Sequence, residues 1–126
     1  MLDIPASENF PPVPLSHALF NAATRGHVNV GKLLLERGAL PEHADITRYS
    51  PLHAAAYRGY TEFVLLLLKY GANIESRQFH GITPLMLAAA GGSLETVQIL
   101  LHAAKRFILI TTDSTFPSKY SIRFLT

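Results

Sequence analysis

Six histidines are the residues of this sequence that could most readily do chemistry, because imidazole binds metals and transfers protons near neutral pH. Zinc sites and acid–base sites hold such groups at set spacings, such as two histidines four residues apart on one helix. The sequence has no such pair, and it has no cysteine for a thiolate nucleophile or a zinc site. The histidines are His17, His27, His43, His53, His80 and His102.

Other catalytic arrangements are also missing from the sequence. No Ser, His and Asp spacing indicates a nucleophile with its base, and Gly91 with Gly92 alone does not make a phosphate-binding loop. Glu36, Glu62 and Glu95 stand where helix ends are expected, which argues against an acid–base pair. We therefore expect no enzymatic activity, no metal, no cofactor and no small-molecule substrate.

Length and composition narrow the class of protein. The 126 residues suffice for one domain, and a hydrophobic content of 48% is enough for a core. Residues 1–104 carry seven Lys and Arg against eight Asp and Glu, whereas residues 105–126 carry four against one. Because the basic excess is confined to four side chains in this tail, we expect neither nucleic acid nor a membrane as partner.

The N-terminal sequence M-L-D-I-P-A-S-E-N-F lacks the basic and apolar segments of a signal peptide. The longest apolar run, residues 63–68, is far too short to span a membrane. We therefore expect an intracellular protein of the cytoplasm or nucleus.

The strongest pattern is an internal repeat with a step of 33 residues. A constant period of this length is the signature of repeat proteins, in which each unit buries its apolar face against its neighbours. The recurring positions are Leu19, Leu52 and Leu85; Ala22, Ala55 and Ala88; Ala23, Ala56 and Ala89; Gly26, Gly59 and Gly92; Leu34, Leu67 and Leu100; and Leu35, Leu68 and Leu101.

The middle unit predicts two short helices and an extended connector. Ser50 can cap the first helix, and Pro51 suits its first position, where no backbone N–H is needed. Gly59 allows the turn to the second helix, and Gly71 can end that helix in a left-handed conformation. Residues 73–82 then form the connector to the next unit.

The middle unit resembles an ankyrin repeat. The family pattern T-P-L-H-x-A-A, G-H, E-V-V-x-L-L-L and G-A-D-V-N is matched by S-P-L-H-A-A-A, G-Y, E-F-V-L-L-L-L and G-A-N-I-E within residues 50–75. The third unit has G-I-T-P-L-M-L-A-A-A at 81–90 and E-T-V-Q-I-L-L at 95–101. The resemblance implies an all-α solenoid of stacked helix-turn-helix units, joined by short extended or β-turn connectors. It divides residues 17–104 into units at 17–49, 50–82 and 83–104, the last incomplete.

The first unit departs from the family pattern. It lacks the Thr-Pro cap and has Asn21 where the other units have Ala54 and Leu87, as expected for a polar end cap. Gly31 falls inside its second helix, where glycine costs about 1 kcal/mol relative to alanine. Arg48 takes the connector position that Gly81 holds in the next unit, so we expect a distorted first connector.

The two ends of the chain depart further. Residues 1–16 contain Pro5, Pro11, Pro12 and Pro14, which predict an extended lead-in. After residue 104 the pattern stops, and the apolar, β-branched residues 107–110 predict a strand or a cover. Either this 105–126 tail folds over the third unit, or the chain is a truncated or alternatively ended form of a longer protein. The lack of any continued repeat favours the second interpretation.

The resemblance also assigns roles to surface and buried residues. It implies that the His53 ring bonds backbone and cap groups, and that a partner binds the concave side, formed by connector tips and exposed ends of first helices. Several of these positions hold Tyr, Arg or Phe, which are frequent among binding hot spots. The expected partner-binding residues are Arg25, Tyr49, Tyr57, Arg58, Arg77, Phe79, His80 and Ile82. The wider surface adds Thr24, Ala44, Ile46, Thr47, Ala90 and Gly91.

The resemblance implies a non-catalytic module for protein–protein interaction, acting as an adaptor or regulatory scaffold. The sequence does not identify the partner protein. The alternative is a structural fragment or truncated isoform of a larger ankyrin-repeat protein, with little activity of its own. Binding of nucleic acid or an anionic membrane through the basic tail has the least support.

Overall fold

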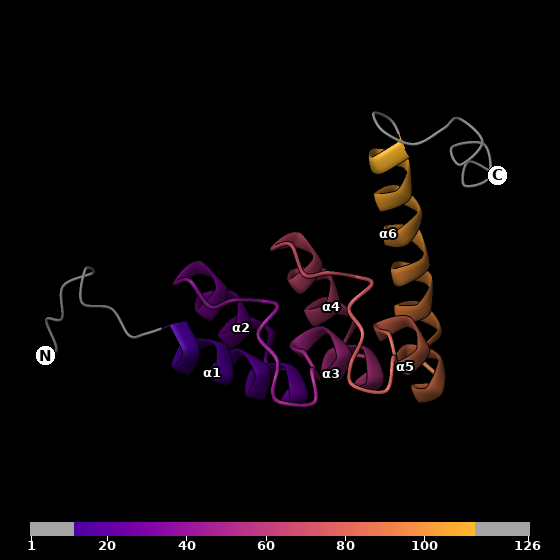
Figure 1. Cartoon of the computed structure of the whole chain (residues 1–126). Helices are drawn as coiled ribbons and strands as arrows, with labels where there is room; N and C mark the ends of the chain where they lie inside the picture. Colours follow the sequence, from indigo (N-terminus) through magenta and orange to yellow (C-terminus); the bar gives the residue numbers. More distant parts are fainter. Residues whose placement is uncertain (1–11, 113–126) are drawn as a thin grey trace, which may run out of the picture.

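The computed structural model describes residues 12–112, and side chains between residues 14 and 105. Residues 12–112 form helices without strands, arranged as three antiparallel pairs that stack side by side (Figure 1). The expected all-α solenoid of stacked helix-turn-helix units is confirmed. The helices are α1 (Pro12–Arg25), α2 (Val28–Glu36), α3 (Pro51–Arg58), α4 (Thr61–Lys69), α5 (Pro84–Gly91) and α6 (Leu94–Thr112).

The pairs stack so that helices of the same kind touch. The first helices α1, α3 and α5 form one row, and the second helices α2, α4 and α6 form another. The connectors that follow α2 and α4 run in parallel along one side of the array (Figure 1). The tips of the connectors therefore lie beside the row of first helices, and the second helices form the opposite row.

The predicted caps begin and end the helices. The hydroxyl oxygen of Ser50 accepts a hydrogen bond from the backbone N–H of His53 at 3.3 Å, and Thr83 does the same for Met86 at 3.3 Å. Gly59 and Gly92 end α3 and α5 in the left-handed conformation, with φ of 74° and 78°. These are the conformations that the sequence signals predict.

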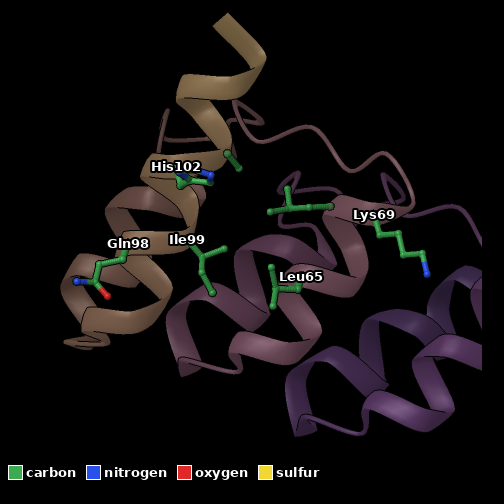
Figure 2. A pocket seen from close by; sticks show the side chains of 7 residues that line it. Leu65, Lys69, Gln98, Ile99 and His102 are labelled. Atoms are coloured by element: carbon green, nitrogen blue, oxygen red, sulfur yellow. The ribbon is translucent and has the colours of Figure 1, made fainter. Parts of the chain in front are cut away.

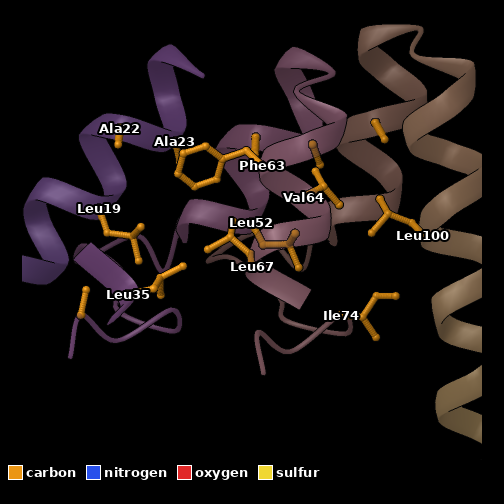
Figure 3. Packing of buried hydrophobic residues seen from close by; sticks show 14 residues of the cluster. Leu19, Ala22, Ala23, Leu35, Leu52, Phe63, Val64, Leu67, Ile74 and Leu100 are labelled. Carbon is orange, nitrogen blue, oxygen red and sulfur yellow. The ribbon is translucent and has the colours of Figure 1, made fainter. Parts of the chain in front are cut away.

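The core is a continuous apolar layer between the two rows of helices (Figure 3). Its members come from all three units, so that each unit completes the burial of the next. The largest fully buried apolar side chains are Leu19, Leu52, Phe63, Val64, Leu67 and Leu100.

Packing against Phe63 explains why a glycine stands inside α2. A Cβ at this position would lie 2.4 Å from Cζ of Phe63, because the ring of this α4 residue packs directly on the backbone of α2. The family pattern has valine where Phe63 stands, so the larger ring is matched by the loss of a side chain opposite. The glycine thus makes room for the larger phenylalanine ring. This gain in packing outweighs the low helix propensity of glycine.

The extended lead-in expected over residues 1–16 is wrong for residues 12–16, because α1 begins at Pro12. Prolines at 12 and 14 fall in the first turn, where backbone N–H groups have no partner within the helix. Because proline lacks only such an N–H group, it costs the helix no hydrogen bond there. Ser16, fully buried, accepts a hydrogen bond from the N–H of Leu40 at 2.9 Å and so anchors this turn to the first connector. Pro5 and Pro11 lie outside the described residues.

The strand expected at residues 107–110 is also wrong, since α6 continues as a helix to Thr112. α4 is stopped by Gly71, whose φ is 93°, but the equivalent position of α6 holds Ala104. Alanine favours helix and does not stop it, so the helix continues. Whether these residues cover the third unit remains a prediction, as do the boundaries at 16 and 104.

Arg48 adopts the backbone conformation of the glycine it replaces. Its φ is 66°, close to the 80° of Gly81, and it is the one non-glycine residue with positive φ in residues 12–112. At this residue the backbone follows the glycine conformation, at a cost of about 1–2 kcal/mol in strain. The distortion expected for the first connector as a whole stays a prediction. The carbonyl of the preceding Thr47 accepts a hydrogen bond from the N–H of Phe79 at 2.7 Å, which joins the two connectors.

Candidate functional site

His53 has a structural role, as the resemblance implied. It is fully buried, and its Nδ1 accepts a hydrogen bond from the backbone N–H of Ser50 at 3.2 Å. Nε2 must then carry the proton, which it donates to the carbonyl of Ile82 at 2.9 Å. Burial lowers the pKa of this imidazole, against a smaller opposing effect of the Ile82 carbonyl. The neutral ring thus ties the cap of α3 to the next connector.

Tyr49 lies between neighbouring units. Its ring stacks on His53 with centroids 5.6 Å apart and meets the edge of Phe20 from α1 at 6.0 Å. Partial burial raises the pKa of the Tyr49 hydroxyl, and the nearby Arg58 guanidinium partly opposes this shift. The first connector is therefore held against α1 and α3, with the end of α3 close to the tyrosine hydroxyl.

The exposed ends of the first helices carry the predicted side chains Arg25, Tyr57 and Arg58. Arg25 is the last residue of α1 and Arg58 the last of α3, and both are exposed to solvent. Tyr57 is 47% exposed although the six residues before it in α3 are all buried. The structure places Arg58 and Tyr57 near Tyr49, whereas Arg25 stands one unit away.

The second connector is ordered by its own hydrogen bonds. The N–H of Gln78 donates to the carbonyl of Ile82 at 3.0 Å, and a guanidinium nitrogen of Arg77 donates to the carbonyl of Gly81 at 3.1 Å. Ile82 is half-buried and its carbonyl also accepts the His53 bond, so its backbone belongs to the scaffold. The connector is thus a preformed turn.

Two predicted residues stand at the tip of this turn. Phe79 is 72% exposed and meets the edge of the His80 ring at a centroid distance of 5.2 Å. Ile46, which is 95% exposed, occupies the equivalent position of the first connector. The sequence placed Ile46 in the wider surface and not among the eight expected partner-binding residues. The period of 33 residues, which relates Ile46 to Phe79, was the signal that could have added it to them.

A groove between α4 and α6 is a second candidate, which the sequence did not indicate. Its volume is about 710 Å³, and Figure 2 shows Ile99 on the side of α6 that faces Leu65 of α4. It arises from the way two helices of different units pack, so no single stretch of sequence contains it. The lining residues are Leu65, Leu68, Lys69, Gln98, Ile99, His102 and Ala103.

The remaining histidines do not gather into a metal centre. His17 and His43 meet edge to face with ring centroids 4.8 Å apart. Within residues 12–112, however, no three His, Asp or Glu side chains come together as ligands. These same residues also contain no helix long and apolar enough to cross a membrane.

A comparison with known protein families identifies the kind of helical repeat in this chain. The family model for ankyrin repeats matches residues 19–109, in three copies. The chain belongs to the ankyrin-repeat family. Among curated proteins, no relative matches this chain. The ankyrin match extends past residue 104, in agreement with the continuous helix α6.

Ankyrin repeats are in general modules for protein–protein interaction, and proteins of this kind are typically non-catalytic. In this ankyrin array the predicted residues divide into two groups. Tyr57, Arg58 and Phe79 expose their side chains, whereas Tyr49 and Ile82 are partly buried and connect the units. The first group is available for contact with another molecule.

Proposed function

We propose that this chain is a non-catalytic adaptor or regulatory scaffold that binds a partner protein with its connector tips and first-helix ends. The observation that carries the proposal is the exposure of aromatic side chains on ordered backbone: Tyr57 on α3 and Phe79 on a hydrogen-bonded turn. Preformed turns lose little conformational freedom on binding, which favours affinity. The binding residues are Arg25, Tyr49, Tyr57, Arg58, Arg77, Phe79, His80 and Ile82, with Ile46 added.

An affinity capture from cell extract tests this proposal. The wild type is compared with the double variant Tyr57→Ala and Phe79→Ala, and captured proteins are quantified by mass spectrometry. The matched control is Leu33→Ala, since Leu33 on α2 is 48% exposed and thus similar to Tyr57. We expect partners that the double variant loses and the control keeps. If folding and captured partners were both unchanged in the double variant, the assigned surface would be wrong.

A second candidate function is that of one part of a larger array, and the flank of the third unit favours it. Ala56 is fully buried against the third unit, whereas its equivalent Ala89 is exposed. Met86 likewise is 51% exposed where its equivalent His53 is fully buried. A further repeat, or the chain's own residues 113–126, could cover this face.

Thermal unfolding of residues 1–112 against the full chain separates these two covers. A cut after residue 112 leaves α6 whole, whereas a cut after 104 would divide it. If the full chain unfolds cooperatively at a much higher temperature, its own C-terminal residues act as the cap and the fragment proposal fails. Equal melting temperatures support the fragment proposal. An intracellular location completes this proposed function, and microscopy of the tagged full chain tests it.

A further inference from the structure

The first helices carry positive and no negative side chains. The sequences of α1, α3 and α5 contain no Asp or Glu, while α1 and α3 end in the exposed Arg25 and Arg58. The second helices hold their own carboxylates, at Glu36, Glu62 and Glu95. A ligand lying along the ends of the first helices therefore meets positive charge.

The connectors carry charges of both signs, and two of their three exposed carboxylates also accept hydrogen bonds within the array. Asp45 accepts hydrogen bonds from the hydroxyl and the N–H of Thr47, the latter at 2.8 Å, and Glu42 accepts one from the N–H of Asn73. Glu75 is exposed, as are Arg48 and Arg77. The surface thus presents four arginines against three carboxylates, and its positive excess lies at Arg25 and Arg58 on the first helices.

The spacing of the arginines specifies the ligand further. Arg25 and Arg58 hold equivalent places in adjacent units, and packed helices lie about 8–10 Å apart. A peptide in the polyproline II conformation advances about 3.1 Å per residue with three residues per turn, so carboxylates three residues apart lie about 9 Å from each other on one face. Arginine pairs well with carboxylates because its planar group donates two parallel hydrogen bonds.

We propose that this surface binds an acidic polypeptide segment in the extended polyproline II conformation, with carboxylates three residues apart paired to Arg25 and Arg58 and an apolar residue against Tyr57 or Phe79. The inference rests on the proposed function and names the chemistry of its partner. The exposed apolar tips, Ile46 and Phe79, favour a polypeptide over nucleic acid. So does the overall charge, because residues 1–104 carry seven basic and eight acidic side chains and generate no extended positive field.

Selection from a random 12-residue peptide library displayed on phage tests the inference with the full chain as bait. We expect enriched peptides with Asp or Glu pairs three residues apart and an aromatic or aliphatic residue nearby. Binding of two enriched peptides is then measured by fluorescence polarisation at 50 and 500 mM NaCl. We expect at least about tenfold weaker binding to Arg25→Gln with Arg58→Gln, and weaker binding at high salt.

The matched control is Lys32→Gln with Arg37→Gln, which removes the same charge from exposed side chains in and next to α2. We expect this control to change binding less than twofold. Charge exchange gives a positive test: Arg25→Glu with Arg58→Glu should bind a peptide whose two carboxylates are replaced by lysines. Circular dichroism of each variant verifies that the helices are intact.

The outcomes separate the two proposals. Peptides that lack acidic pairs but lose binding with Tyr57→Ala and Phe79→Ala overturn the acidic-ligand inference and leave the proposed function standing. Peptides unaffected by the aromatic and the arginine variants, or no enrichment above empty beads, overturn both. Tighter binding of a labelled single-stranded dT oligonucleotide than of the best peptide overturns the inference in favour of nucleic acid.

Discussion

At the scale of single residues, Gly31 gives the clearest prediction. Helix propensity alone predicts that Gly31→Ala stabilises α2 by about 1 kcal/mol. The ring of Phe63 occupies the space for the added methyl group, with Cζ 2.4 Å from the Cβ position. We therefore expect a loss of about 1–3 kcal/mol in the free energy of unfolding, measured with urea.

A double-mutant cycle with Phe63→Val isolates the cause of this loss. The smaller side chain makes room for the methyl group, so Gly31→Ala should cost less in the valine background than in the wild type. A stabilising effect of Gly31→Ala in the wild type would contradict the packing described for α2 and α4.

Replacing Arg48 by glycine should stabilise the fold, in contrast to the loss expected for Gly31→Ala. Its φ of 66° is unfavourable for a residue with a side chain, and glycine relieves this strain while adding flexibility to the unfolded chain. We expect Arg48→Gly to raise the unfolding free energy by a few tenths to about 1 kcal/mol. Arg77→Gly serves as the control because Arg77 does not have positive φ, and it should give no gain. An equal gain in both variants would show that charge, not backbone strain, is responsible.

His53 predicts how stability depends on pH. Burial lowers the pKa of the folded imidazole, so below the unfolded value of about 6.5 the unfolded chain binds the proton more readily. The stabilisation is fully present above pH 6.5 and falls as the pH decreases toward the folded pKa. His53→Met, which copies the third unit, should flatten this part of the profile in urea unfolding at pH 5 to 8. An unchanged slope would mean that other groups cause it.

At the scale of elements, the approach of α5 to α3 depends on Gly91. A Cβ there would lie 2.2 Å from the backbone carbonyl oxygen of Tyr57, which cannot rotate away as a side chain can. We expect Gly91→Ala to separate the two helices and to cost at least about 2 kcal/mol in thermal or urea unfolding. Ala90→Ser, on the neighbouring exposed position, should change stability by about 0.5 kcal/mol or less. Equal effects of the two variants would contradict this close approach.

The helices of the middle unit were predictable because local signals agree with the repeat. Ser50, Pro51 and Gly59 each specify a backbone conformation that the stacked fold also requires. Errors arose at the ends, where the repeat gives no constraint. Pro12 and Pro14 act as breakers only inside a helix, and β-branched residues after Ala104 form a helix because no glycine stops α6.

The candidate site was predictable in position more than in structure. The period and the family resemblance placed Tyr57 and Phe79 on the exposed surface, and both side chains are exposed. The sequence could not predict that Tyr49 packs between Phe20 and His53, because this contact joins residues of two units and depends on the stacking distance. The groove between α4 and α6 escaped for the same reason.

At the scale of the whole molecule, the array separates scaffold from surface. The buried apolar layer joins the three units. The first-helix ends and connectors expose side chains that are not part of this layer. At the flank formed by Met86 and Ala89, two positions lie open whose equivalents in the middle unit are buried.

The most direct test of the binding surface is a hydrogen–deuterium exchange footprint of the full chain with a captured partner protein. Slower exchange is predicted for the backbone amides of residues 44–49, 57–60 and 77–82, with no change in the lining of the α4–α6 groove. Protection confined to residues 65–69 and 98–103, with the connectors exchanging as in the free chain, would place the partner in the groove and contradict the account.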